Sequence, residues 1–190
     1  MAEKSIRETI EECAGRTGFC SILNRFEYSY RHILPVRAGE KRFLALQESE
    51  FRFDGYIIED YATVDRAVPA DERFSEIARL EGLLDGPEAP PVELSSYRSI
   101  FAFLCNAGYN VEIETGTPGG GGISIFTGRV TNCTEHDFRL LRFGIDCRWD
   151  NFPVTVWYDD LRVVRFGSKY LEMYSKHLPT CPVNPVRFNF

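Results

Sequence analysis

Residues 85–91, with the sequence DGPEAPP, are the strongest interruption in this chain of 190 residues. Three prolines and a glycine within seven residues do not continue a helix or a central strand, and the periodic patterns on both sides stop here. The interruption predicts a Gly/Pro linker over residues 85–92, between an N-terminal domain over 1–84 and a C-terminal domain over 93–190. Length alone allows one or two domains, so it is the interruption that favours two.

The charge of the chain is divided unevenly between these two parts. Residues 1–92 contain 12 basic and 18 acidic residues, a net charge of −6, whereas residues 93–190 contain ten of each. The acidic average argues against nucleic-acid binding by the whole chain. It does not exclude nucleic-acid binding by the neutral second half.

The first half is expected to contain a helix, a run of short strands and a second helix. Residues 5–14 place Ile6, Ile10 and Cys13 on one helical face. Alternating apolar residues then predict strands, and Asp71 is placed to cap a helix that ends at Gly82. The expected strands lie at residues 19–26, 31–36, 42–47, 51–58 and 62–68.

The second half is expected to repeat this plan. Ser95 or Ser96 can cap a helix that ends at Gly108, and a short helix is expected over residues 170–177, followed by an extended tail. Between them, strands are expected at residues 111–114, 123–131, 138–145, 154–158 and 161–166.

The similar plans suggest an internal duplication. A shift of 99 residues places residues 53–64 over residues 152–163, and Gly18 matches Gly128 with a shift of 110. Closure of a small sheet into a barrel removes exposed edges, which favours a barrel in a unit of about 90 residues. The expected fold class is therefore α+β, mostly β: two tandem small antiparallel β-barrels, each preceded by a helix.

The order and spacing of the strands resemble the Sm-like fold, the small barrel of RNA-associated Sm proteins. Segments 51–64 and 139–166 carry the resemblance, and their phrases also look like those of uncharacterised bacterial proteins with such barrels. The resemblance implies SH3-like barrels. The RNA-binding signatures of the Sm-like family are not matched residue by residue, so no site residue is transferred from it.

The ends and the cysteines point to a cytoplasmic protein. No signal peptide is visible, and no window approaches the roughly 18 apolar residues of a membrane helix. Six cysteines without a C-x-x-C spacing are expected to be buried reduced thiols rather than disulfides, and three distant histidines make a metal site improbable. No cofactor and no metal are expected.

Three motifs suggest chemistry but have simpler structural explanations. The run Gly119–Gly122 is followed by a strand and no lysine, so a hairpin connection is expected rather than a phosphate loop. Neighbours such as Asp159 and Asp160 point to opposite faces of a strand, which favours a tight turn over a metal or acid–base site. Cys133, His136 and Asp137 lack an oxyanion motif, so catalysis is not expected.

The second half also offers a candidate nucleic-acid surface. Arginine beside exposed aromatic rings can hold single-stranded nucleic acid through phosphate contacts and stacking. Strand alternation favours the alternative, in which the aromatic residues form the core and the arginines pair with Asp146, Asp150 and Asp159. The six arginines are Arg129, Arg139, Arg142, Arg148, Arg162 and Arg165.

The sequence is thus interpreted as a non-enzymatic protein-interaction or scaffolding module with an unknown protein partner, and a homo-oligomer is the second option for the partner. RNA or single-stranded nucleic-acid binding through the Arg/aromatic-rich second half is the alternative function. An enzyme ranks third.

Overall fold

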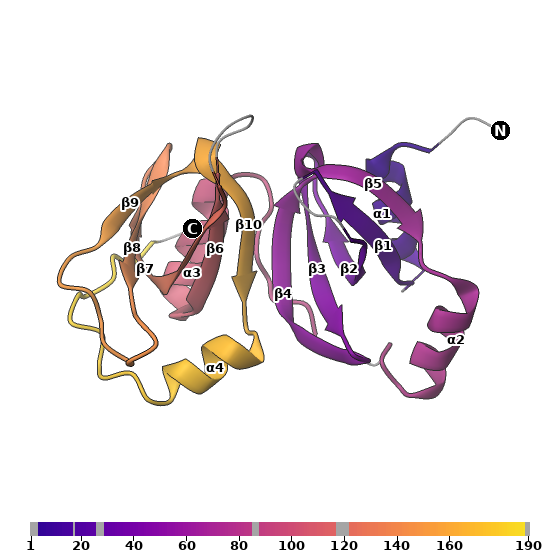
Figure 1. Cartoon of the computed structure of the whole chain (residues 1–190). Helices are drawn as coiled ribbons and strands as arrows, with labels where there is room; N and C mark the ends of the chain where they lie inside the picture. Colours follow the sequence, from indigo (N-terminus) through magenta and orange to yellow (C-terminus); the bar gives the residue numbers. More distant parts are fainter. Residues whose placement is uncertain (1–3, 17, 26–28, 85–87, 117–121, 189–190) are drawn as a thin grey trace. The chain divides into compact units, whose positions relative to one another are not determined.

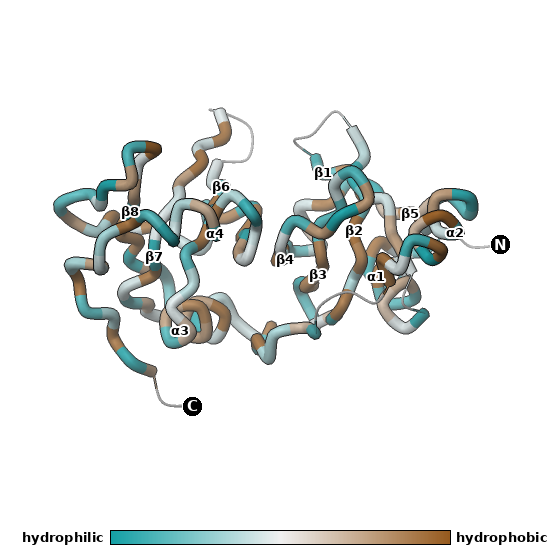
Figure 2. Tube along the Cα trace, turned by 90° about the horizontal axis from the view of Figure 1, so that it is seen from below, coloured by the Kyte–Doolittle hydropathy of each residue, from teal (hydrophilic) through white to brown (hydrophobic). Residues whose placement is uncertain are grey.

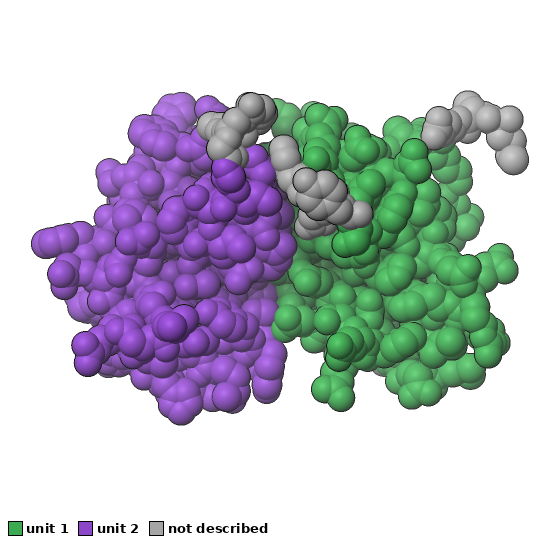
Figure 3. All heavy atoms as spheres, viewed as in Figure 1, with its two compact units in different colours: residues 1–91 green, residues 92–190 purple. Residues whose placement is uncertain are grey.

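The computed structural model describes residues 4–16, 18–25, 29–84, 88–116 and 122–188. The chain divides into two compact units, unit 1 over residues 1–91 and unit 2 over residues 92–190 (Figure 3). Residues 85–87 of the expected linker lie outside the described residues. The neighbouring residues 88–91 belong to no helix or strand.

Unit 1 begins with a helix, continues through a strand meander and returns its last strand to the first (Figure 1). Its helices are capped as the sequence predicts: the Ser5 Oγ accepts from the Glu8 N–H, and the Asp71 carboxylate accepts from the N–H groups of Arg73 and Phe74. The elements are α1 (Ile6–Gly15), β1 (Cys20–Asn24), β2 (Arg31–Ala38), β3 (Arg42–Ser49), β4 (Arg52–Asp60), the 3₁₀ turn η1 (Tyr61–Thr63), β5 (Val64–Pro69) and α2 (Glu72–Leu80).

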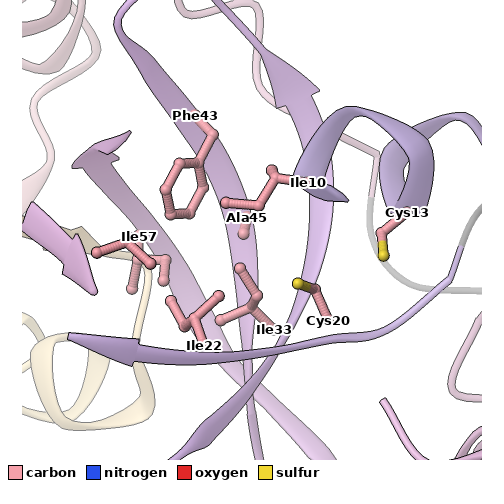
Figure 4. Packing of buried hydrophobic residues seen from close by; sticks show 9 residues of the cluster. Ile10, Cys13, Cys20, Ile22, Ile33, Phe43, Ala45 and Ile57 are labelled. Carbon is pink, nitrogen blue, oxygen red and sulfur yellow. The ribbon is translucent and has the colours of Figure 1, made fainter. Parts of the chain in front are cut away.

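The sheet of unit 1 is antiparallel, with the strand order β5-β1-β2-β3-β4. Both of its faces are covered, because consecutive residues of a strand point to opposite sides. Ile33 belongs to the cluster beneath α1 (Figure 4), whereas its neighbour Leu34 belongs to the cluster that includes Ala78 of α2. The apolar residues of β2 and β3 are the brown parts of these strands in Figure 2. The two clusters anchor a helix on each side of the sheet.

A buried ion pair accompanies the cluster beneath α1. Arg31 of β2 pairs with Glu59 of β4, and the Glu59 side chain is fully buried while that of Arg31 is 14% exposed. At the same end of β4, the Arg42 Nε donates to the Asp60 carboxylate at 2.7 Å. Charge therefore lies inside unit 1 as well as on its surface.

Unit 2 has the same order of elements. Its first helix is capped by Ser96, whose Oγ accepts from the Ser99 N–H at 3.0 Å, and it ends at Gly108, where φ is +70°. The elements are α3 (Tyr97–Ala107), β6 (Asn110–Thr115), β7 (Ser124–Cys133), β8 (Asp137–Arg142), β9 (Val154–Trp157), the 3₁₀ turn η2 (Tyr158–Asp160), β10 (Leu161–Phe166) and α4 (Lys169–Ser175).

The sheet of unit 2 is antiparallel, with the order β10-β6-β7-β8-β9. Helix α3 packs on β7 and β8, and the ring of Phe101 stacks on that of Phe138 with centroids 3.8 Å apart. The Tyr158 ring lies parallel to both. This aromatic stack is the centre of the unit 2 core, in keeping with the expectation that the aromatic residues are core residues.

The expected barrels are wrong, although the α+β class is confirmed. The antiparallel sheet structure is open: in the described residues of unit 1, β5 pairs with β1 and β4 pairs with β3, and no ladder joins β4 to β5. The same holds for β9 and β10 of unit 2. Closure is one way to protect a sheet edge, but short strands and edge charges are another. Strand β5 carries Asp65, Arg66 and Pro69, and β9 has only four residues.

The expected repeat registers are also wrong. The two 3₁₀ turns begin at Tyr61 and Tyr158, which are 97 and not 99 residues apart. Gly18 precedes β1, the first strand of unit 1, whereas Gly128 lies within β7, the second strand of unit 2. The two units are alike in the order of their elements. This likeness in topology is not by itself evidence of a duplication.

Candidate functional site: a groove beside edge strand β9

Strand β9 is the last strand in the sheet of unit 2 and pairs with β8 alone among the described strands. Beyond its end, the Tyr158 N–H donates to the His136 C=O at 3.0 Å. Backbone groups in an antiparallel strand alternate in direction, so Val154 and Val156 also face β8. The N–H and C=O groups of Thr155 and Trp157 therefore point away from β8 and form an open edge.

A groove of about 480 Å³ runs along this edge. All four residues of β9 line it, together with the end of β6 and the beginning of β7 across from them. The remaining lining residues are Thr115, Gly116, Gly122, Ser124, Phe126, Arg142 and Asp160. The groove thus combines an unpaired strand edge with apolar and hydroxyl-bearing side chains.

The positive charge in the groove is compensated. The Arg142 guanidinium pairs with the Asp150 carboxylate at 2.7 Å and lies 5.6 Å from the centre of the Phe126 ring. Its donors are therefore shared with a carboxylate, and its planar face rests near an aromatic ring. Arg142 is consequently held in place at the side of the groove, and its charge is balanced by Asp150.

Asp160 and Gly116 form one end of the groove. The Gly116 N–H donates to the Asp160 C=O at 3.0 Å, and the Arg162 Nε donates to the Gly116 C=O at 3.2 Å. A side chain at Gly116 would meet the Arg162 guanidinium at 2.5 Å. Arg162 is only 6% exposed, so it braces this end of the groove from inside.

Large apolar side chains are exposed near the groove. Trp157 is 54% exposed and Ile125 59%, and Phe152, just before β9, is 78% exposed. Single exposed apolar residues are normal, but these are an aromatic residue of the edge strand, a phenylalanine two residues before that strand, and a residue of β7 whose two neighbours line the groove. Sequence reasoning identified the strand 154–158 but missed its role as an edge. The signal was its short length and the exposed aromatic residue at its end.

The candidate nucleic-acid surface is largely occupied by contacts within the protein. Arg165 pairs with Glu112 and Glu114, Arg148 lies 3.8 Å from the Asp146 carboxylate, and the Arg139 Nη1 contacts the Thr155 hydroxyl. Arg142 and Arg162 are held as described above, and Arg129 donates to Asn110.

The six side chains also do not form one face. Arg129, Arg139 and Arg165 share one side of the sheet, since Arg129 and Arg165 are paired with Asn110 and Glu112 of β6. Arg142 points to the opposite side, and Arg162 is buried. Of the acidic partners expected, Asp150 and Asp146 lie beside arginines, whereas the exposed Asp159 forms no ion pair with a described residue.

The other candidate motifs do not assemble a reactive site. The Cys133 thiol lies 3.7 Å from the Arg98 C=O, and burial raises its pKa to about 11, which disfavours the reactive thiolate. His136 is exposed in a turn, and Asp159 and Asp160 lie in η2 rather than in the expected β-turn. Gly119–Gly121 lie outside the described residues.

All six cysteines are free. Four are buried, as expected, but Cys147 and Cys181 are only half-buried. Within the described ranges no group of three or more His, Cys, Asp or Glu side chains is arranged to hold a metal ion. No described helix is long and apolar enough to cross a membrane.

No known protein family, curated protein or solved structure matches the chain. The resemblance to the Sm-like family therefore stays a prediction that no comparison tests.

Proposed function

We propose that the protein is a non-enzymatic interaction module that binds an extended segment of a protein partner along β9. The observation that carries this proposal is the open edge: the outward backbone groups of Thr155 and Trp157 border a groove of about 480 Å³. An added strand would satisfy these groups and place alternate side chains in the groove, which is the general basis of β-strand addition.

The groove suits such a segment better than it suits a reacting small molecule. Its charged residues are a paired arginine, Arg142, and one carboxylate, Asp160, while Phe126 and Val156 provide apolar contact. Backbone hydrogen bonds would supply affinity, and the mixed polar and apolar lining of the groove would select side chains at every second position of the partner. Nucleic-acid binding, the alternative from the sequence, is less well supported because carboxylates neutralise Arg142 and Arg165.

A proline substitution tests the edge with little disturbance of the ladder to β8. Thr155→Pro removes an N–H that points away from β8, and proline is tolerated at such edge positions. Thr155→Ala is the matched control, because it removes the same hydroxyl but keeps the N–H.

The probe is a displayed library of random 12-residue peptides panned on the full chain, followed by affinity measurement on the selected synthetic peptides. We expect Thr155→Ala to change the Kd less than about threefold and Thr155→Pro to weaken it about tenfold or more. Amide exchange at Thr155 and Trp157 should slow in the complex. Failure to select any peptide, or equal binding by Thr155→Pro, would show that the edge is not a binding site.

A further inference from the structure

A second cavity of about 370 Å³ lies in unit 2 between the end of α3 and helix α4. It shares no lining residue with the groove beside β9. Tyr109 and the buried Leu171 give it apolar surface, and Arg129 and Lys176 give it positive charge. Two glycines with φ near +70°, Gly108 and Gly167, also line it and add no side chains.

Arg129 is held in place by a chain of hydrogen bonds. Its Nε donates to the Asn110 Oδ1 at 3.1 Å, and the Asn110 Nδ2 donates to the Ser175 Oγ at 2.7 Å. The Ser175 hydroxyl donates in turn to the Leu171 C=O at 2.6 Å. Asn110 is 6% exposed, so the chain is fixed at its centre. The Arg129 guanidinium also lies 5.8 Å from the centre of the Trp149 ring. Its position is therefore set before any ligand arrives.

This arrangement leaves donors for a ligand. A guanidinium has five N–H groups, and the hydrogen bond of Arg129 within the described residues uses only the one on Nε. The remaining pair of nitrogens has the fork geometry that matches a carboxylate or a phosphate. Lys176, exposed at the end of α4, supplies a second cation.

The nearby negative groups are already engaged. Glu172 lines the cavity, but its carboxylate lies 3.8 Å from the Lys169 ammonium group. The N–H groups of Gly108 and Tyr109 donate to the C=O groups of Cys105 and Leu104, which satisfies carbonyls at the end of α3. The charged side chains that line the cavity therefore leave a net positive charge for an incoming anion.

We propose that this cavity binds a small organic anion, with its carboxylate or phosphate group on Arg129 and Lys176 and its apolar body against Tyr109 and Leu171. The apolar surface and the volume suit a ligand of one ring or a short chain. The proposal concerns a different site from the β9 groove, and each can fail without the other.

The test measures binding of phenyl phosphate, benzoate and inorganic phosphate to the full chain by tryptophan fluorescence. The chain has two tryptophans, so a Trp157→Phe background leaves Trp149, the ring beside Arg129, as the single reporter. Benzyl alcohol serves as the neutral analogue of the two ring-bearing anions. We expect saturable binding of at least one ring-bearing anion, tighter than that of benzyl alcohol by about tenfold or more.

Charge variants in the same background assign the site. We expect Arg129→Gln to weaken binding about tenfold or more and Lys176→Gln to weaken it severalfold, because charge-assisted hydrogen bonds are lost. Arg139→Gln removes an equal charge from an exposed arginine outside the cavity and should change binding less than twofold.

If Arg129→Gln unfolds, Arg129→Lys keeps the charge without the forked pair of nitrogens and should still weaken binding. The proposal is wrong if no anion saturates, if benzyl alcohol binds equally well, or if Arg139→Gln has the same effect as Arg129→Gln.

Discussion

The buried ion pair of unit 1 provides the sharpest test of how this fold is stabilised. Glu59 is fully buried, and its carboxylate pairs with the Arg31 guanidinium. Glu59→Gln removes the negative charge while nearly preserving shape, and it leaves the Arg31 cation facing a neutral amide. Loss of one partner of a buried pair typically costs about 3–5 kcal/mol, because the remaining charge stays desolvated.

The partial exposure of Arg31 sets where the result should fall within this range. Its side chain is 14% exposed, so water can solvate part of the guanidinium once the Glu59 charge is removed. We therefore expect a loss near the lower limit, about 3 kcal/mol. The double variant Arg31→Met with Glu59→Met should recover most of this loss, since both charges leave the core together.

The measurement is urea unfolding by far-ultraviolet circular dichroism, combined with amide exchange at Phe43 and Ile57, both in the core cluster beside the pair. Both tryptophans belong to unit 2, so their fluorescence serves as the reference for that unit. Glu76→Gln is the matched control: its pair with Arg73 is exposed on both sides and should contribute no more than about 1 kcal/mol. Equal losses in Glu59→Gln and Glu76→Gln would refute the argument that burial makes this pair costly to break.

Three further results are expected. Gly128→Ala should destabilise the full chain by about 1–3 kcal/mol or more in urea unfolding, because its Cβ would lie 2.4 Å from the Leu141 backbone oxygen; Gly15→Ala, with nothing within 4 Å, should not. Burial raises the pKa of Cys105 and Cys133 to about 11, whereas thiols of the unfolded chain have a pKa of about 8.5. Between these two pH values the folded state therefore holds more protons than the unfolded state. Unfolding midpoints should therefore fall as the pH rises from about 8.5 towards 11, and less steeply when either cysteine is replaced by alanine. Finally, a mixed-sequence oligonucleotide should show no binding to the full chain at moderate salt, measured by fluorescence polarisation, and salt-dependent binding would restore the nucleic-acid interpretation.

Local signals in the sequence predicted the helices well. Asp71, Ser96 and Gly108 each act at the helix end where they were expected, because capping depends on residues within one turn of the chain. The strands were equally readable from alternation, with limits shifted by a few residues; the strand expected over 138–145 ends at Arg142. These features need no knowledge of distant partners.

Sheet closure could not be read in the same way. Whether β4 meets β5 depends on where the chain goes after a three-residue turn, and the sequence of η1 does not encode that direction. The prediction relied on closure as the way to remove exposed edges. It gave too little weight to Asp65, Arg66 and Pro69, which make β5 a poor template for another strand without any closure.

The partners of the six arginines could not be read from the sequence for a related reason. Alternation places arginines on strand faces, but only the register shows that Arg165 stands opposite Glu112. Likewise, the pairing of Arg142 with Asp150 depends on the loop between β8 and β9 returning its carboxylate to the sheet. Counting arginines therefore overestimated the available positive charge.

This local compensation helps to locate function in unit 2. Its basic and acidic residues are equal in number, so a surface of neutral pairs attracts neither anions nor cations strongly. A binding site is then expected where a strong hydrogen-bonding group is held rigidly but is not used up by a neighbour. Among the described residues of unit 2, two places meet this condition: the outward backbone of Thr155 and Trp157, and the guanidinium of Arg129, whose position Asn110 fixes. The first matches the backbone of an extended chain and the second matches an oxyanion, so the two sites call for chemically different ligands and can be separated by single substitutions.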